Sequence, residues 1–470
     1  IDWKGMLTTI GFVKVAYASL DRLPTEAALE DDDRAPTFLH LVPAYQEPEI
    51  AQTLGGLLAS RYPHGRLHVV VVTKEEEERA PHPAMGAPTA ELVRRFRAEL
   101  PPYAQKTLWP LTLPGPGRKA EQLNWALRPE ALREILGESF DPSRIFVGVS
   151  DADSLPDPNV YRWIAGEELA GRGAWAYQGV TLSLSNFTRL DIRGRISAIQ
   201  QSSIFIRVSI ARLINEAKRV RFIERLCARV PLLAPLLRPA FDLWFRRSQI
   251  CLGHNQFVRL DCLQSLGGFP TAGATEDSTL GYELGARGIL IKPMPMLELN
   301  DLPETPEKIV RQNARWYKGV LDDVSHLWRT WKRAPTAYNL AQLCRHVGSK
   351  AVEWPIAAGV YPVVGFLGWQ LAYIYRDHFW LFLFSLAFPS VALGLTVWVA
   401  GIVTQELIEE LAPYLPKPVD LRRKTFRDKF WGIFRSQTYW LLATRGAWRV
   451  LLALVRTGRY EPAKTDRIRR

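Results

Sequence analysis

Cysteine is scarce in this sequence, and the few cysteines present form no metal-binding pattern. The chain has 470 residues and four cysteines, Cys227, Cys251, Cys262 and Cys344, without a CxxC pair or a nearby histidine at zinc-ligand spacing. This pattern argues against a disulfide-built scaffold and against a cysteine-ligated zinc site. We therefore expect four reduced, buried thiols on the cytosolic side.

A secretory signal is also missing from the N-terminal part of the sequence. Residues 1–30 lack the succession of charged, apolar and small residues that marks a signal peptide. Residues 5–20 are apolar, but Lys14 interrupts them, and they are shorter than the ~20 residues that a membrane span requires. Because the sequence begins with Ile1 rather than Met, we expect residues 1–35 to hold an interfacial helix or a truncated membrane helix.

Acidic residues are few in two long segments, so positive charge is concentrated there. The formal charge of the chain is +12, yet residues 207–247 contain ten Arg and Lys against three acids, and residues 422–470 contain fourteen against three. Charge alone is compatible with nucleic-acid binding. In both segments, however, Leu, Ile, Phe and Trp recur between the basic residues at helical spacing, which favours an anionic membrane surface. We expect a lipid bilayer with anionic lipids as a partner, and no nucleic acid.

Prolines subdivide the first of these basic segments. We expect Pro231, Pro235 and Pro239 to break residues 200–250 into short amphipathic helices that lie along a membrane interface. An ordinary amphipathic lid over the domain core is the alternative interpretation.

Strands and helices alternate in the first two thirds of the chain. Residues 38–42 and 68–72 are short β-branched runs bounded by turn signals, and residues 49–60 between them have helical spacing. Residues 144–149 form a third buried-strand candidate. This alternation predicts an α/β domain over residues 36–325, with a mainly parallel sheet and helices on both faces.

Two long hydrophobic runs follow this domain. Residues 356–375 and 379–403 are apolar and long enough to cross a bilayer, and only Arg376-Asp377-His378 separates them. They predict a transmembrane hairpin within residues 326–410, after an interface helix. A buried pair of soluble helices is the rival interpretation, and the uninterrupted length argues against it.

Basic residues flank the predicted hairpin on both sides. They are Arg329, Lys332, Arg333, Arg345 and Lys350 before it, and Arg422, Arg423 and Lys424 after it. The positive-inside rule places both flanks in the cytoplasm. We therefore expect an integral membrane protein whose catalytic domain and basic amphipathic tail, residues 411–470, are cytoplasmic.

Two carboxylates, Asp151 and Asp153, follow the third predicted strand. At strand spacing both side chains point the same way, and such a pair resists joint ionisation unless a cation lies with it. Mg²⁺ and Mn²⁺ suit carboxylate oxygens together with substrate phosphates. The alternative is an ordinary turn, where Asp is common. The position after a buried strand favours a metal site at Asp151 and Asp153.

A second acidic motif, Thr275-Glu276-Asp277, follows a turn rich in Gly and Ala. Asp277 could accept the proton of an attacking hydroxyl group. An N-cap for the helical residues 280–284 is the alternative, and both roles are compatible.

A cationic motif, Gln312-Asn313-Ala314-Arg315-Trp316, comes shortly before the hydrophobic runs. The planar guanidinium of Arg315 matches the oxygens of a pyrophosphate leaving group. Gln312 lies one helical turn earlier on the same face, and Trp316 offers a flat platform for a sugar ring. Lys119, at the start of a predicted helix, suits phosphate or ribose contact, with a solvent-facing lysine as the alternative.

These motifs, in this order, resemble the family 2 glycosyltransferases, in particular the membrane-integrated branch that contains cellulose, hyaluronan and chitin synthases. The resemblance covers roughly residues 38–325 and weakens through the hairpin. It rests on VPAYQE at residues 42–47, KAEQLNWAL at residues 119–127, DAD at 151–153, TED at 275–277 and QNARW at 312–316. It implies a GT-A domain, with a Rossmann-like mixed, mainly parallel sheet, and an inverting single displacement.

The resemblance also assigns roles to single residues. It implies that Asp277, together with Glu276 and Arg315, is catalytic, with Asp277 as the general base. It implies that Asp153, beside Asp151, ligates Mn²⁺ or Mg²⁺. Acceptor contacts are implied for His254, Asn255 and Trp316, although a structurally satisfied histidine is a common alternative. The implied donor-binding residues are Pro43, Ala44, Tyr45, Glu47, Lys119, Asn124, Asp151, Gln312, Arg315 and Trp316.

The chain departs from the family pattern in two places. The family usually has an Asp after the second strand that recognises the base, whereas this chain has Lys74-Glu75-Glu76, so UDP and GDP remain alternatives with UDP favoured. The chain also has one hairpin where secreting synthases have more spans. The predicted function is transfer of a sugar from a nucleotide-sugar to a saccharide or lipid-linked acceptor. The alternatives are a polyprenyl-phosphate glycosyltransferase and a non-catalytic scaffold that binds nucleotide-sugar.

Overall fold

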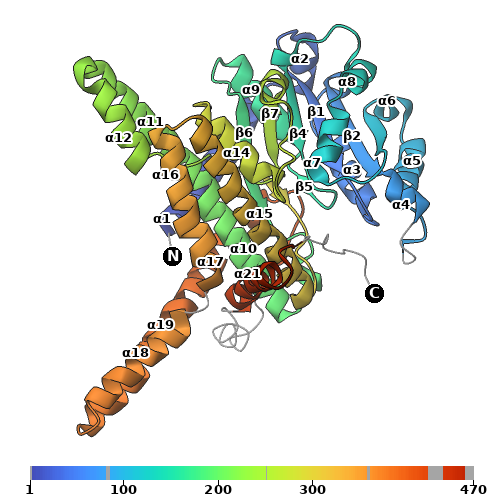
Figure 1. Cartoon of the computed structure of the whole chain (residues 1–470). Helices are drawn as coiled ribbons and strands as arrows, with labels where there is room; N and C mark the ends of the chain where they lie inside the picture. The colour runs from blue at the N-terminus through green and yellow to red at the C-terminus, as the bar shows by residue number, and fades with distance from the viewer. Residues whose placement is uncertain (1–2, 81–84, 250, 357–359, 422–437, 461–470) are drawn as a thin grey trace.

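The structure is a computed structural model that describes residues 3–80, 85–249, 251–356, 360–421 and 438–460 (Figure 1). Its centre is one eight-stranded sheet with the strand order β3-β2-β1-β4-β7-β6-β8-β5. The strands are β1 (Thr37–Pro43), β2 (Leu67–Lys74), β3 (Leu108–Leu113), β4 (Ile145–Val149), β5 (Leu155–Pro156), β6 (Ala176–Leu182), β7 (Gln256–Arg259) and β8 (Lys292–Leu299).

The sheet is mixed, as the sequence predicted. β1 pairs in parallel with β2 and β4, β2 pairs in parallel with β3, and β6 pairs in parallel with β8. β7 runs antiparallel to both β4 and β6, and β5 runs antiparallel to β8. The three predicted strands correspond to β1, β2 and β4, and their carboxyl ends meet at one edge, where α/β sheets present their ligand sites.

Alternate residues of the central strands feed two separate hydrophobic cores. In β1, Phe38 and Val42 point into one core, and Leu39 and Leu41 point into the other. Both faces are therefore buried, which explains why these strands read as continuous apolar runs.

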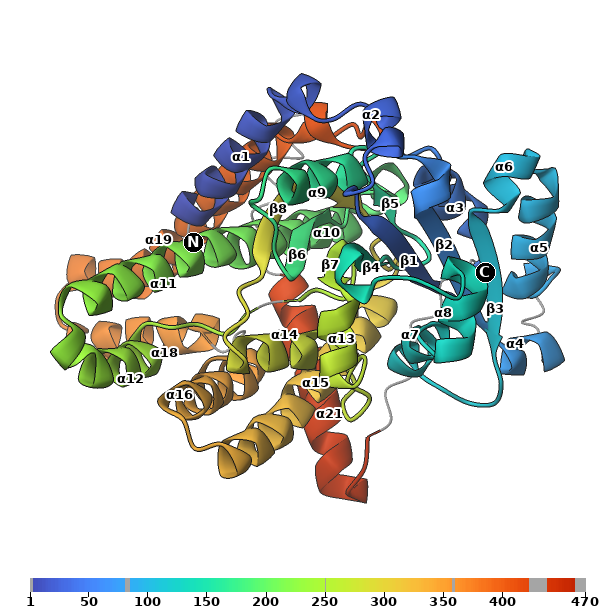
Figure 2. The same cartoon turned by 90° about the horizontal axis from the view of Figure 1, so that it is seen from above.

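Helices cover both faces of the sheet, and Figure 2 shows the two layers. The first core is covered by α2 (Glu26–Asp31), α3 (Ile50–Leu58), α5 (Thr89–Glu99) and α9 (Val160–Leu169). The second is covered by α7 (Lys119–Ala126), α8 (Pro129–Leu136), α13 (Leu260–Leu266) and α14 (Glu276–Ala286). Two short helices, α4 (Glu75–Arg79) and α6 (Pro102–Gln105), connect the outer strands.

A helical layer packs beside β6 and β8 around a third hydrophobic core. It contains α1 (Trp3–Tyr17), α10 (Ile192–Ile204) and the π-helical turn η6 (Phe205–Ile210). Met6, Ile10 and Val13 of α1 are fully or almost fully buried in this core. The N-terminal helix thus packs one face against the protein, while Leu7 and Val15 are exposed.

The remaining helices extend this layer toward the C-terminus. They are α15 (Pro306–Arg333), α16 (Ala337–His346), the π-helical turn η8 (Val347–Val352), α17 (Glu353–Ile356) and α21 (Thr438–Thr457). α21 lies across α15, where Gly446 packs against the backbone of Val310 and Ala314. It falls within the basic amphipathic tail predicted for residues 411–470, of which residues 422–437 and 461–470 lie outside the described residues.

Two helical pairs project from the same side of the body, the left in Figure 1, and diverge, one upward and one downward. One pair is α11 (Ala211–Arg229) and α12 (Ala234–Trp244), which fall in the predicted interfacial segment. The prediction that three prolines break this segment was wrong, because α12 accepts Pro235 in its first turn and runs through Pro239. The single break lies around Pro231.

The other projecting pair is α18 (Val360–Ile374) and α19 (Phe379–Glu409), which form the predicted hairpin. Within the part of the chain whose side chains are described, no helix is long and apolar enough to cross a membrane. The transmembrane prediction for residues 356–375 and 379–403 is therefore not supported by the structure.

Two further predictions concern cysteines and the basic flank. Cys227, Cys251 and Cys262 are free and buried as expected, but Cys344 is exposed, because it lies on the outer face of α16. The basic residues Arg422, Arg423 and Lys424 lie outside the described residues.

Candidate active site

The loop after β1, residues 42–47, is held by a buried carboxylate from α4. Glu77 accepts hydrogen bonds from the backbone N–H of Gln46 at 3.0 Å and from the hydroxyl of Thr89 at 2.6 Å. The Thr89 hydroxyl oxygen in turn accepts from the backbone N–H of Glu47 at 3.0 Å. On the other side, the Gln122 side chain donates to the carbonyl oxygen of Ala44 at 3.0 Å. The predicted nucleotide loop is thus fixed by side chains from three helices, α4, α5 and α7.

Tyr45 projects from this loop toward the acidic run that replaces the expected Asp. Its hydroxyl donates to Glu76 at 3.4 Å, and the ammonium of Lys74 lies 4.6 Å from the centre of its ring. Glu75 points elsewhere, because it accepts from the backbone N–H of Gly115 at 3.2 Å and pairs with Arg79. Of the two glutamates that could replace the Asp that recognises the nucleobase, Glu76 contacts the predicted nucleotide loop. Glu75 instead stabilises the loop before α7.

Lys119 contacts both the DAD and the TED motif, which lie far apart in the sequence. Its ammonium group donates to Asp151 at 2.7 Å and to the carbonyl oxygen of Gly253 at 2.6 Å, and it lies 3.4 Å from Glu276. Burial lowers the pKa of Lys119, but the charges of Asp151, Glu276 and Asp277 outweigh burial and raise it. A permanent cation therefore sits between the DAD and TED motifs, and the solvent-facing alternative for Lys119 is wrong.

Asp277 begins α14 and is only partly exposed. Burial and the nearby charge of Glu276 raise its pKa to about 7, against the opposing effect of Lys119. One carboxylate oxygen accepts from the backbone N–H of Ser278 at 2.8 Å. Asp277 is not the N-cap of α14, because Thr275 occupies that position and Asp277 lies within the first turn. Its raised pKa is compatible with a general base, and that role stays a prediction.

A glycine allows the backbone to approach this carboxylate. Gly253 has φ +77°, and a Cβ atom there would lie 2.8 Å from an oxygen of Asp277 and 3.3 Å from the ammonium of Lys119. Any side chain at this position would both strain the backbone and enter the site.

Helix α15 fastens the TED motif from behind. Asp323 accepts from the hydroxyls of Ser278 at 2.5 Å and Thr279 at 3.0 Å, and Asp322 accepts from the backbone N–H of Ala274 at 3.0 Å. Gly319 packs so closely on Thr275 that a Cβ atom would lie 2.3 Å from its hydroxyl oxygen. These contacts fix α14 on α15.

The QNARW motif lies on the same helix, and Arg315 is one turn before Gly319 on the same face. Arg315 is partly exposed and has no hydrogen-bond or ion-pair partner among the described residues. Gln312 is buried, and Trp316 is partly exposed. An arginine next to the TED motif can therefore turn its guanidinium to a leaving group.

Two predicted contact residues have structural partners instead. The amide of Asn124 donates to and accepts from the backbone of Phe269, at 2.8 and 2.7 Å. Asn255, with φ +47°, donates to the carbonyl oxygens of Val180 and Met296, both at 3.0 Å. Both amides are thus engaged in shaping the loops around the site, and their predicted sugar contacts stay predictions.

His254 belongs to a buried network that supports the DAD loop. Its Nδ1 lies 2.9 Å from Glu298, which is fully buried on β8. Glu298 also accepts from the hydroxyls of Ser150 at 2.7 Å and Ser154 at 3.2 Å, on either side of the DAD motif. Burial lowers the pKa of His254, but the hydrogen bond and charge of Glu298 raise it more, so the net shift is upward.

The described carboxylates do not complete a divalent-metal site by themselves, so a bound donor would have to supply further oxygen atoms. Among the described residues, no three His, Cys, Asp or Glu side chains are grouped to hold a metal ion. Asp151 contacts Lys119, and Asp153 accepts from the backbone N–H of Asp301 at 3.1 Å. Two hard carboxylates on one loop fit Mg²⁺ or Mn²⁺ when phosphates and water complete the coordination.

Sequence reasoning missed several residues that organise the site. Glu298 could have been suspected, because it is a lone carboxylate inside the apolar strand MPMLEL. Glu77 is one of four consecutive glutamates, and Asp322 and Asp323 lie among other polar residues of α15. Nothing in the sequence distinguishes these three carboxylates from ordinary surface residues.

A mixed α/β sheet with the VPAYQE and DAD motifs at the carboxyl ends of β1 and β4, and the TED and QNARW motifs on α14 and α15, has the architecture of a GT-A glycosyltransferase. The family model described as "Glycosyltransferase like family 2" matches residues 35–319. The chain belongs to this family. The membrane-integrated synthase branch is not established by that match.

The solved structures that match the chain are distant in sequence. The mannosyltransferase PcManGT of Pyrobaculum calidifontis, in complex with GDP-Man and Mn²⁺, is 15% identical with a TM-score of 0.43, covering 95% of this chain and 97% of that one. TarS of S. aureus, residues 1–349, is 12% identical with a TM-score of 0.36, covering 90% and 92%. Its complex with UDP-GlcNAc is 11% identical with a TM-score of 0.36, covering 76% and 91%. No curated protein sequence matches the chain.

Proposed function

We propose that this family 2 glycosyltransferase is an inverting, metal-dependent enzyme that uses a nucleotide-sugar, with UDP-sugars favoured, and a saccharide or lipid-linked acceptor. The observation that carries the proposal is the cluster around Lys119, which joins Asp151, Glu276 and Asp277 at the carboxyl edge of the sheet. The positive charge of Lys119 within such a cluster suits a phosphate-bearing donor, and a carboxylate beside it can act as the base.

In this proposal Asp277 takes the proton from the acceptor hydroxyl. The freed oxygen attacks the anomeric carbon from the face opposite the nucleoside diphosphate, so one C–O bond forms as the other breaks and the configuration inverts. Arg315 on α15 stabilises the negative charge that develops on the departing diphosphate. The elevated pKa of Asp277 suits it to hold this proton.

Asp153, with Asp151, would hold Mn²⁺ or Mg²⁺, which neutralises diphosphate charge when bound. Lys119 holds one oxygen of Asp151. We therefore assign the direct contact with the ion to Asp153. Asp151 then serves to orient the nucleotide and to keep Lys119 in place.

We also propose that the enzyme works at a membrane with its catalytic domain on the cytoplasmic side. Large apolar side chains are exposed along the α18–α19 hairpin, among them Phe366, Phe379 and Trp380. Exposed apolar patches of this kind mark contact with a partner or with lipid. Basic residues on both flanks favour the cytoplasmic side.

The first test is nucleotide release by purified, detergent-solubilised protein across UDP-, GDP- and dTDP-sugars, with Mn²⁺, Mg²⁺ or EDTA. We expect one donor to be turned over and EDTA to abolish the reaction. Full activity in EDTA would exclude the metal assignment.

The assignment of the base is tested by Asp277→Asn. We expect the rate of transfer to fall about 10²–10⁴-fold, the usual contribution of a positioned general base, with donor affinity retained. The rate is followed by nucleotide release and the affinity by calorimetric titration of the donor. Equal loss of both quantities would contradict the assignment of Asp277 as the base.

A further inference from the structure

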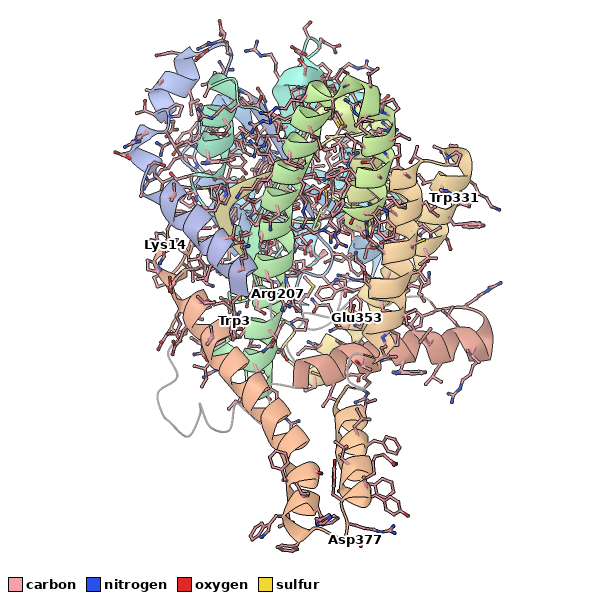
Figure 3. All side chains as sticks on the ribbon, turned by 90° about the vertical axis from the view of Figure 1, so that its left-hand side faces the viewer. Trp3, Lys14, Arg207, Trp331, Glu353 and Asp377 are labelled. Carbon is pink, nitrogen blue, oxygen red and sulfur yellow. The ribbon has the colours of Figure 1, made fainter. Side chains whose placement is uncertain are left out.

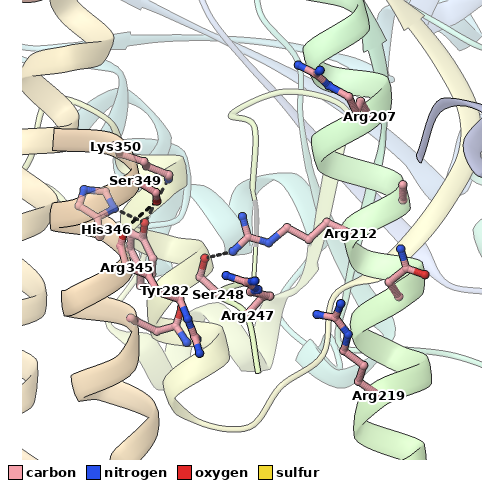
Figure 4. A pocket seen from close by; sticks show the side chains of 13 residues that line it. Arg207, Arg212, Arg219, Arg247, Ser248, Tyr282, Arg345, His346, Ser349 and Lys350 are labelled. Atoms are coloured by element: carbon pink, nitrogen blue, oxygen red, sulfur yellow. Dashed lines mark hydrogen bonds between the residues drawn. The ribbon is translucent and has the colours of Figure 1, made fainter. Parts of the chain in front are cut away.

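A separate cavity of about 350 Å³ lies between α11 and α16, outside the cluster around Lys119 (Figure 4). Its walls come from η6 and α11 on one side, α16 and η8 on the other, and the segment after α12, while Tyr282 of α14 contributes to the lining. None of the predicted donor, metal or acceptor residues lines it. The cavity is therefore a distinct feature of the molecule.

The cavity is strongly cationic. The basic residues that line it are Arg207, Arg212, Arg219, Arg247, Arg345 and Lys350, and no Asp or Glu is among the described residues of its lining. A neighbouring acid, Glu216, is buried and accepts from the backbone N–H of Arg247 at 3.0 Å. Burial raises the pKa of Glu216, against the opposing charges of Arg246, Arg219 and Arg212.

The arginines of the cavity differ in the hydrogen bonds that their guanidinium groups make to other parts of the protein. Arg345 donates both ends of its guanidinium to the backbone carbonyls of Leu243 and Arg246, so it builds the wall. Arg212 donates to the hydroxyl of Ser248 at 2.6 Å, and its buried Nε has no hydrogen-bond partner among the described residues. Arg247 is exposed at the rim. Arg212 and Arg247 thus offer donors that the protein itself does not use.

The uncharged polar groups Tyr282 and His346 are already hydrogen-bonded within the protein. The Tyr282 hydroxyl lies 2.6 Å from His346 Nδ1 and accepts from Lys350 at 3.2 Å, while His346 Nε2 lies 2.8 Å from the carbonyl oxygen of Val320. Burial and the charge of Lys350 lower the pKa of His346 to about 4, so the imidazole is neutral and donates through Nε2. Tyr282 and His346 are saturated by each other, and the charge that faces the cavity is that of the arginines and Lys350.

We propose that this cavity binds the phosphate groups of a ligand other than the sugar donor. Several guanidinium forks converging on one space match phosphate oxygens in geometry and charge. A volume of about 350 Å³ exceeds what one phosphate needs and accommodates a diphosphate or a phosphorylated headgroup. The ligand is either a soluble phosphate compound or a phosphorylated lipid headgroup, which share this chemistry.

The position of the cavity connects such a ligand with the catalytic helix. Tyr282 lies on α14, whose first turn carries Glu276 and Asp277, and Lys350 bonds to Tyr282. Arg207 lies at one end of the cavity in Figure 4, and Figure 3 shows it at the height of Glu353, which begins the helix leading to the hairpin.

The test uses inorganic pyrophosphate titrated into the full chain in EDTA, with binding followed by calorimetry. Arg247→Glu changes an exposed rim residue, and Arg225→Glu is a charge-matched control on the exposed face of α11, outside the cavity. If the natural ligand is soluble, we expect Arg247→Glu to weaken saturable pyrophosphate binding at least about tenfold and Arg225→Glu to leave it unchanged. Arg212→Gln should show the same loss.

A second arm addresses the lipid source. Co-sedimentation with vesicles of phosphatidylcholine containing phosphatidylglycerol is compared for the same variants. Selective loss of vesicle binding in Arg247→Glu, without pyrophosphate binding by the wild type, would assign the cavity to a lipid headgroup. If Arg247→Glu and Arg212→Gln match the wild type in both arms, or if Arg225→Glu loses binding equally, the proposal is wrong.

Discussion

Lys119 is the residue through which the separate motifs become one site. It reaches Asp151, Glu276 and the backbone of Gly253, three positions more than 30 residues away along the chain. Its charge moderates the repulsion between Glu276 and Asp277, which would otherwise raise the proton affinity of Asp277 further. The proton affinity of the base is therefore set by its neighbours rather than by its own motif.

A pH dependence arises from the raised pKa of Asp277. Because this pKa is about 7, the carboxyl is protonated at pH 5 and cannot accept a proton, so kcat/KM should rise as the pH passes through 7. The pH profile of nucleotide release checks this expectation. A profile that is flat between pH 5 and pH 8 would contradict it.

The same shift has a consequence for stability. A carboxyl whose pKa is higher in the folded than in the unfolded state stabilises the fold at low pH, and this contribution is lost as the pH rises toward the folded pKa. Asp277→Asn should therefore raise Tm relative to the wild type at pH 8 but not at pH 4. Melting curves of both proteins at the two pH values measure this difference.

The close approach at Gly253 gives a further prediction. Gly253→Ala adds a Cβ atom 2.8 Å from the Asp277 carboxylate at φ +77°, so transfer should fall sharply in addition to a stability loss of about 1–2 kcal/mol. Gly267→Ala is the matched control, because φ there is +82° and nothing lies within 4 Å of the added atom. Both variants should lose similar stability, and only Gly253→Ala should lose kcat. Equal kcat values in the two variants would show that the contact is unimportant.

Among the elements, α15 has the widest role in the site. It carries the QNARW motif, binds α14 through Asp323, and receives α21 on its other side. Its first half also enters the third core through Ile309 and Val310. Since one rigid helix bears all these contacts, a displacement of α21 is expected to reach Arg315.

Gly446 is the point at which that coupling can be tested. A Cβ atom there would lie 2.8 Å from the backbone N of Ala314, next to Arg315. We expect Gly446→Val to cost about 1–3 kcal/mol of stability through overpacking and to lower kcat, as measured by denaturant unfolding and nucleotide release. Arg445→Val places the same side chain on the exposed face of α21 and should leave kcat unchanged.

At the scale of the whole molecule, two projections leave the same side of the body and diverge, the α11–α12 pair upward and the α18–α19 hairpin downward in Figure 1. Both expose large apolar side chains, Trp380 at 78% on the hairpin and Phe222 at 65% on α11. Our proposal assigns the membrane to the α18–α19 hairpin.

This assignment predicts different effects of charge at the two projections. Phe379→Glu with Trp380→Glu should abolish vesicle binding, because burying two carboxylates in lipid is unfavourable. Phe222→Glu with Leu232→Glu, which adds the same charge to the α11–α12 pair, should leave it intact. Vesicle co-sedimentation provides the measurement, and the opposite pattern would move the membrane contact to α11 and α12.

The sequence by itself determined the sheet strands β1, β2 and β4 and the order of the motifs that follow them. These features are local, because a strand buried on both faces must be a continuous apolar run and a motif is a short string. The weaker strands were missed. β3 contains a proline and is only half buried, and β5 has two residues.

Only the tertiary structure decided which side chains meet. Glu298 lies 148 residues from Ser150, Asp323 lies 45 residues from Ser278, and the cationic cavity gathers residues from Arg207 to Lys350. The sequence likewise predicted a donor contact for Asn124 and an acceptor contact for Asn255, and only the fold shows that both amides also bond to backbone groups. Hydrogen bonds and ion pairs act over a few ångströms, and the distance between remote residues is set by how the helices and strands pack together.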